Sequence, residues 1–256
     1  MDTHDHLDRL RHHVRRPLAR TPYAWDAAMM LRPDKRSTLV RSDTALVIDG
    51  FLRSGNTFSV AAFVIANGDA LHVGRHLHGG AHILRAARLG VPAVVLIRRP
   101  GDAVASYLIR RPSLTPKDAL VEYLDFYRTC WRARDHFVVG LFDNVIADFG
   151  SVVRAVNQRF DTTFRLYEPT AANQAAAFAL VEEMNRKECG GEVVESHVGR
   201  PSAERQGLKQ DILRRMQAPE AMKPLRRAEE WYERYVALAS ASRASGGPWN
   251  SVRRTP

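Results

Sequence analysis

A glycine-containing loop between an apolar run and a helical run is the segment of this 256-residue chain best suited to chemistry. The loop covers residues 50–57 and follows the nearly all-apolar residues 44–49. In a parallel sheet, the loop after a buried strand leads to a helix whose first N–H groups and positive dipole end attract an anion. We therefore expect residues 50–57 to bind a phosphate group.

The spacing of Gly50, Gly55 and Thr57 is that of a P-loop, but the lysine position of that motif holds Asn56. A cation is supplied three positions earlier by Arg53. Backbone N–H groups can still surround a phosphate in such a loop, with an arginine as the charged partner. The alternative interpretation is an ordinary βα turn with an exposed arginine.

A second strand-loop-helix segment begins at the apolar residues 94–97 and continues through Arg98 and Asp102 to Ser106. Arg98 stands at the carboxyl end of the expected strand, and Ser106 lies inside the following helix. An arginine and a hydroxyl group placed in this way can bind a second phosphate together. Asp102 is expected to cap that helix.

Together, the two segments resemble the sulfotransferases that use 3′-phosphoadenosine 5′-phosphosulfate (PAPS). Residues 53–57, followed by Phe58, look like the 5′-phosphosulfate loop of that family, and Arg98, Asp102 and Ser106 look like its 3′-phosphate motif. The resemblance covers residues 44 to about 160. It implies a P-loop-like sulfotransferase fold, PAPS as the donor and adenosine 3′,5′-bisphosphate as the product.

The same resemblance assigns roles to individual residues. Arg53 would also act in catalysis by assisting the departure of the bisphosphate, and a late basic loop would add two further arginines to the 3′-phosphate site. Those two are equally well interpreted as surface arginines. The implied PAPS-binding residues are Arg53, Ser54, Gly55, Asn56, Thr57, Phe58, Arg98, Ser106, Arg200 and Arg205.

In this family the catalytic base is a histidine between the two phosphate motifs, usually followed by leucine. His76, followed by Leu77, fits this pattern best, and an imidazole with an unperturbed pKa of about 6.5 can accept a proton near neutrality. The residues before and after this pair differ from the usual family pattern. The base therefore stays open among His72, His76, His78 and His82. The chemistry requires no metal.

The hydrophobic pattern predicts how these residues are positioned. Apolar runs alternate with helical segments, which favours an α/β fold with a parallel sheet flanked by helices on both faces. Strands are expected at residues 44–49, 70–73, 91–97 and 136–142, and helices at 57–67, 81–89, 101–110 and 116–134. The remainder is mainly helical in pattern, at residues 152–160, 171–187, 209–216 and 223–239.

We interpret residues 1–256 as one domain, because 256 residues with 45% hydrophobic content suit a single core. Its expected parts are a helical lead-in without a functional role (1–43), the PAPS-binding core (44–160), a helical acceptor-side region (161–239) and a mobile tail (240–256). Four aromatic residues of the central helix either line the acceptor pocket or belong to the core: Tyr123, Phe126, Tyr127 and Trp131.

Composition limits the possible partners. The formal net charge of +10 attracts anionic ligands, but the arginines are interspersed with acids and form no basic stripe, which argues against nucleic-acid binding. No apolar run is long enough to cross a membrane, and we expect a cytoplasmic, bacterial protein with two free thiols, Cys130 and Cys189. The expected acceptor is a hydroxyl group on a small molecule, glycan or lipid.

Three rival functions remain open. A P-loop kinase or nucleotide-binding protein would share the loop, although Asn56 replaces its lysine, and it would need a magnesium-binding aspartate such as Asp49 or Asp143. A catalytically inactive sulfotransferase-like binder would use the same residues. A non-enzymatic binder of membrane surfaces would depend on net charge alone.

Overall fold

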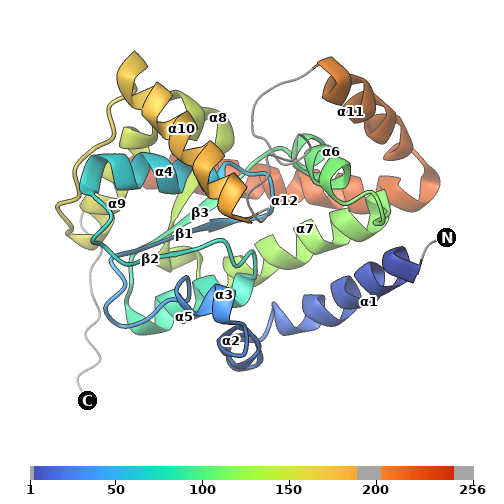
Figure 1. Ribbon diagram of the computed structural model, residues 1–256, viewed down its shortest axis with the longest axis horizontal. Coiled ribbons are helices and arrows are strands. Elements are labelled where there is room, and N and C mark those ends of the chain that lie inside the picture. Colours follow the sequence, from blue (N-terminus) through green and yellow to red (C-terminus); the bar gives the residue numbers. More distant parts are fainter. Residues whose placement is uncertain (1–2, 189–202, 245–256) are drawn as a thin grey trace.

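The computed structural model describes residues 3–188 and 203–244, and Figure 1 shows their arrangement. The strands are β1 (Leu46–Gly50), β2 (Val73–Arg75), β3 (Ala93–Ile97) and β4 (Val138–Leu141). They form one all-parallel sheet in the order β2-β1-β3-β4. The predicted α/β class and parallel sheet are confirmed.

Helices cover both faces of the sheet. One face packs against α4 (Asn56–Asn67), α8 (Phe142–Ala147), α9 (Phe149–Phe160) and α10 (Ala171–Glu188). The other face packs against α5 (Gly80–Leu89), α6 (Pro100–Arg110), α7 (Pro116–Trp131), α11 (Ala203–Arg215) and α12 (Pro219–Ala244). Every residue of β1 and β3 is buried, as expected for strands covered on both faces.

Local sequence explains where several elements begin. Thr115 and Asp118 form the capping box expected before α7, with each side chain accepting from the backbone N–H of the other residue. Asp102 does not cap α6, contrary to prediction: its carboxylate instead pairs with Lys209 of α11 at 2.5 Å. Strand β2 begins three residues later than the start predicted for it, because pairing with β1 begins at Val73.

The lead-in consists of α1 (Thr3–Leu18), α2 (Pro22–Met30) and α3 (Pro33–Arg36), and it packs on the main domain. Trp25 of α2 is buried with Leu77 in a small apolar cluster beside the sheet. At the other end of the chain, α12 continues to Ala244, five residues into the expected tail. Residues 1–2, 189–202 and 245–256, among them Cys189 and Arg200, lie outside the described part.

The central aromatic residues belong to the core. Tyr123, Phe126 and Tyr127 are almost fully buried between α7 and its neighbours, and Trp131 packs against the same cluster. The hydroxyl groups of Tyr123 and Tyr127 donate to the backbone carbonyls of Arg98 and Leu96, at 2.9 and 2.8 Å. Of the two interpretations of these four residues, the core one holds.

Candidate functional site

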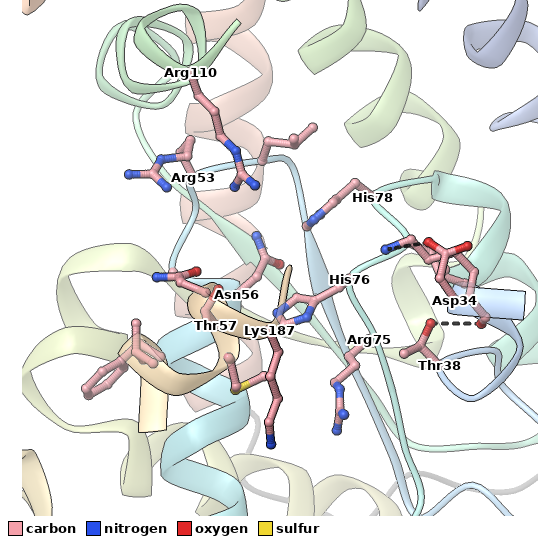
Figure 2. A pocket seen from close by; sticks show the side chains of 18 of the residues that line it. Asp34, Thr38, Arg53, Asn56, Thr57, Arg75, His76, His78, Arg110 and Lys187 are labelled. Atoms are coloured by element: carbon pink, nitrogen blue, oxygen red, sulfur yellow. Dashed lines mark hydrogen bonds and ion pairs between the residues drawn. The ribbon is translucent and has the colours of Figure 1, made fainter. Parts of the chain in front are cut away.

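The carboxyl ends of β1 and β3 form the crevice at which ligands bind in open parallel sheets. After β1 the chain turns to α4 on one face, and after β3 it turns to α6 on the other. A crevice opens where neighbouring strands send their connections in opposite directions. A cavity of about 560 Å³ lies there, and Figure 2 shows residues that line it.

The loop after β1 is shaped by two glycines. A Cβ atom on Gly50 would collide with the carbonyl oxygen of Leu96, so the close approach of β1 and β3 requires glycine at this position. Gly55 is the N-cap of α4 with φ 90°, a conformation that favours glycine, and a Cβ atom there would press on Phe142 at 3.3 Å. The N-terminus of α4 therefore faces the cavity without a capping side chain.

The two phosphate-motif segments meet through their side chains. The Nε of Arg53 donates to the Oγ of Ser106 at 2.9 Å, and an Nη of Arg98 donates to the carbonyl of Arg53 at 3.2 Å. The contact joins the β1–α4 loop to the end of β3 and the middle of α6. The sequence prediction that Arg98 lies beside the first loop is confirmed.

Arg98 is held in a partly buried position. Its guanidinium group lies 4.0 Å from the ring centroid of Phe142. Burial lowers the pKa of Arg98, whereas Asp102 and Asp143 raise it. Because an arginine starts from a pKa above 12, the side chain stays charged at neutral pH and offers a preorganised cation to the cavity.

Asn56 is the residue at the lysine position of the P-loop pattern. Its side chain is buried, and its amide nitrogen donates to the carbonyl of Phe51 at 3.0 Å. The side chain therefore stabilises the loop from within. Thr57 and Phe58 also line the cavity, whereas Ser54 is fully buried and approaches the hydroxyl group of Tyr127 at 3.5 Å.

Asp49, the residue before Gly50, connects the first loop to the histidine segment. Its fully buried carboxylate accepts from the backbone N–H groups of Leu77 and His78, at 3.3 and 3.1 Å, and from Nδ1 of His82 at 3.0 Å. Burial alone would raise the pKa of Asp49, but hydrogen bonds and charge from His78 and His82 hold it well below its ordinary value. Asp49 therefore stays ionised and positions the segment after β2.

Two of the four candidate bases are structural. The Nε2 of His82 accepts from the backbone N–H of Val40 at 3.2 Å while its Nδ1 donates to Asp49. His72 contacts Thr44 through Nδ1 at 2.8 Å and the Ser37 carbonyl through Nε2 at 3.0 Å. Both ring nitrogens are engaged in each case, and neither histidine lines the cavity.

His76 and His78 do line the cavity, and both have left-handed backbones, with φ 55° and 49°. Nonglycine residues rarely adopt this conformation, and such residues gather at functional sites. The Nδ1 of His78 lies 2.9 Å from the carbonyl of Gly50, which can only accept, so Nδ1 carries the proton. The Nε2 of His78 is then the nitrogen that can take up a proton.

The lead-in helices, to which the sequence analysis assigns no functional role, supply part of the cavity wall. Residues of α1, α2 and α3 line the cavity, among them Arg15, Trp25 and Lys35. Arg15 pairs with Glu122 of α7 at 2.7 Å and donates to the carbonyl of Leu77 at 2.8 Å and to that of His78 at 3.3 Å. Arg15 lies in no motif, so no pattern in the sequence predicts its place at the cavity.

The electrostatic character of the cavity is strongly positive. Nine arginine or lysine side chains and two carboxylate side chains are among the residues that line it. Arg53 and Arg110 lie at one end in Figure 2, and Arg75 and Lys187 at the other, with His76 between them. Arg205 belongs to α11, but the structure does not describe its side chain, so its predicted contact stays open.

In comparisons with known proteins, no family model, no curated protein and no solved structure matches this chain significantly. The functional assignment therefore depends on the residues and their geometry.

No helix within residues 3–188 and 203–244 is long and apolar enough to cross a membrane. The same part of the chain holds no group of three or more histidine, cysteine, aspartate or glutamate residues placed to bind a metal ion. The cysteine at position 130 is a free, buried thiol, in agreement with prediction.

Proposed function

We propose that this protein is a sulfotransferase with a P-loop-like sulfotransferase fold, which moves a sulfuryl group from PAPS to a hydroxyl acceptor. The observation that carries the proposal is the meeting of Arg53, Arg98 and Ser106 beside the N-terminus of α4. Two guanidinium groups, a hydroxyl group and a helix N-terminus form a donor set suited to two separate phosphates. PAPS has phosphate on both its 5′ and 3′ positions.

The residues present fit this donor better than a nucleoside triphosphate with magnesium. Asn56 is buried where a kinase would extend a lysine. Asp49, the better candidate for a magnesium ligand, has its carboxylate occupied by N–H donors and is fully buried. A magnesium site would need a carboxylate that the ion can reach. A site that binds phosphate with arginines, a hydroxyl group and a helix N-terminus matches sulfuryl transfer.

In the proposed reaction, the acceptor oxygen forms a bond to sulfur while the bond between sulfur and the bridging phosphate oxygen breaks. The acceptor proton passes to a histidine, and the products are a sulfate ester and adenosine 3′,5′-bisphosphate. Arg53 would neutralise the leaving phosphate, and the N–H groups of residues 55–57 would hold it in place. Arg98 and Ser106 would hold the 3′-phosphate.

His76 remains our sequence-based prediction for the base, and His78 is the second candidate. Geometry supports His78, because the Gly50 carbonyl and the nearby Asp49 carboxylate fix the proton on Nδ1 and leave Nε2 to accept. Sequence pattern supports His76, because leucine follows it. Both side chains line the same cavity, so single variants can separate the two candidates.

The first test is a calorimetric titration with adenosine 3′,5′-bisphosphate, compared with ATP and magnesium. The proposal predicts at least about tenfold tighter binding of the bisphosphate, because a charged contact to the 3′-phosphate exists for that ligand alone. Preference for ATP with magnesium would support the kinase alternative and overturn the proposal. Binding of the bisphosphate without transfer to any hydroxyl compound would favour the inactive binder.

A further inference from the structure

The cavity end opposite the phosphate loop holds a cation, Arg75, to which the proposed binding of PAPS assigns no role. Arg75 is the last residue of β2 and lines the cavity next to His76. In a regular strand, consecutive side chains point to opposite faces of the sheet. The left-handed backbone of His76 interrupts this alternation, so that Arg75 and His76 both line the cavity.

Within residues 3–188 and 203–244, Arg75 differs from the other cations near it because its side chain has no protein partner. Arg32 and Lys35 share the carboxylate of Asp34, at 3.0 and 3.7 Å, and Lys187 pairs with Glu183 at 2.6 Å. Among the described residues, the Arg75 guanidinium has neither a hydrogen bond nor an ion pair, whereas the backbone N–H of Arg75 donates to the Thr38 carbonyl at 3.1 Å.

Burial of the Arg75 side chain adds a desolvation free energy that no nearby described carboxylate offsets. The side chain is partly buried, and burial lowers its pKa with no carboxylate acting in the opposite direction. Arg98, at the other end of the cavity, is buried in a similar way but has Asp102 and Asp143 nearby. A partly buried cation without an anion carries a desolvation cost that a bound anion would offset.

We propose that Arg75 is a specificity residue that binds an anionic group, a carboxylate, phosphate or sulfate, on the acceptor. The inference rests on the proposed sulfotransferase function for the identity of the second substrate. Because Arg75 is the neighbour of His76, the anionic group stands close to the hydroxyl group that becomes sulfated. The acceptor is therefore compact and already charged, and neutral phenols or alcohols are poor substrates.

The test uses three proteins: wild type, Arg75→Gln and the matched control Arg32→Gln. Arg32 lines the same cavity and the control removes the same charge, but Arg32 is already paired with Asp34. Each protein is saturated with adenosine 3′,5′-bisphosphate, which occupies the donor phosphate sites, and is then titrated with inorganic phosphate. Thermal unfolding is measured in parallel, and Arg75→Lys serves as a second variant in case Arg75→Gln does not fold.

We expect phosphate affinity to fall about tenfold or more in Arg75→Gln, less in Arg75→Lys, and less than about twofold in Arg32→Gln. Bisphosphate affinity should be equal in all of them. Equal phosphate affinity in Arg75→Gln and wild type would overturn the inference, as would an equal loss in Arg32→Gln, which would indicate a diffuse field. If no protein binds the bisphosphate, the proposed function fails, and phosphate titration of the unloaded proteins still decides the role of Arg75.

A transfer assay supplies the second readout once the bisphosphate is shown to bind. Radiolabelled PAPS is offered with glucose and with glucose 6-phosphate, which carries a phosphate in place of the free 6-hydroxyl group and keeps the other hydroxyl groups. The inference predicts that wild type prefers the phosphorylated sugar and that Arg75→Gln loses at least about tenfold of this preference through KM. Equal use of both sugars by wild type, or a preference that Arg75→Gln retains, would count against it.

Discussion

The two ends of the cavity are built in different ways. The motif residues of the phosphate-loop end come from two short segments, residues 50–58 and 98–106, each of which follows a buried strand. Arg110 and Phe142 complete the lining at this end. The opposite end combines residues of the lead-in, the β2–α5 segment and the end of α10. The first end is determined by local strand-loop-helix order, whereas the second depends on how distant helices pack.

Asp49 joins the two ends, and replacing it gives the largest effect we expect. Asp49→Asn would place an amide where the carboxylate accepts from Leu77, His78 and His82. Breaking a buried charged network costs about 3 kcal/mol or more. The free energy of unfolding, measured with urea, should fall by that amount, while the exposed control Asp43→Asn should change it far less.

The same residue predicts the direction of a pH effect. The folded-state pKa of Asp49 is depressed, so its contribution is fully present above the unfolded value of about 3.9 and is lost as pH falls below it. Wild type should therefore lose more stability than Asp49→Asn between about pH 5 and pH 2. Parallel pH curves for the two proteins would show that the carboxylate contributes little.

The next largest effect separates the two cavity histidines. Replacing the true base by alanine should reduce turnover at least about 10²-fold while bisphosphate affinity is retained. We expect this loss in His76→Ala from sequence or in His78→Ala from geometry, and a much smaller one in the other variant. His72→Ala is the control from outside the cavity. Near-normal turnover in both cavity variants would remove histidine from the mechanism.

A smaller effect should appear at the phosphate-loop end. Arg98→Ala should weaken bisphosphate binding about tenfold, because one charge-assisted contact is lost. The adjacent Arg99 is exposed and packs over Tyr232 outside this cavity, so Arg99→Ala is a matched control. Calorimetry would measure both variants. Equal affinity in Arg98→Ala and wild type would exclude the second motif from the phosphate site.

The sequence predicts the phosphate-loop end of the cavity better than the opposite end. The contact between Arg53, Arg98 and Ser106 could be anticipated, because neighbouring parallel strands bring their carboxyl ends together. Strands β1 and β3 were visible as apolar runs. The short helix α8 is absent from the prediction, which ends the strand at Phe142 and begins the next helix at Val152.

The opposite end of the cavity, which holds His76 and His78 (the histidine end), could not be predicted from the sequence, for physical reasons. The left-handed backbones of His76 and His78 exist because Asp49 and Arg15 hold the segment from two sides, and no local pattern encodes a tertiary constraint of that kind. Likewise, Arg15 reaches the site through its pairing with Glu122, 107 residues along the chain. Spacing along the sequence carries no information about such a contact.

Arg15 provides the smallest expected effect and the sharpest test of the difference between the two ends. Arg15→Gln removes the donor to the Leu77 and His78 carbonyls, and leaves the residues of the phosphate loop untouched. Turnover should fall about threefold to tenfold with unchanged bisphosphate affinity, because a slightly displaced base lowers the rate of transfer. Its neighbour Arg16 pairs with Asp125 at 2.7 Å and does not line the cavity, which makes Arg16→Gln the matched control.

If bisphosphate affinity falls along with turnover in Arg15→Gln alone, the two ends are coupled through the lead-in helix. The histidine end and the phosphate loop would then act as one unit, whatever the difference in how they are built.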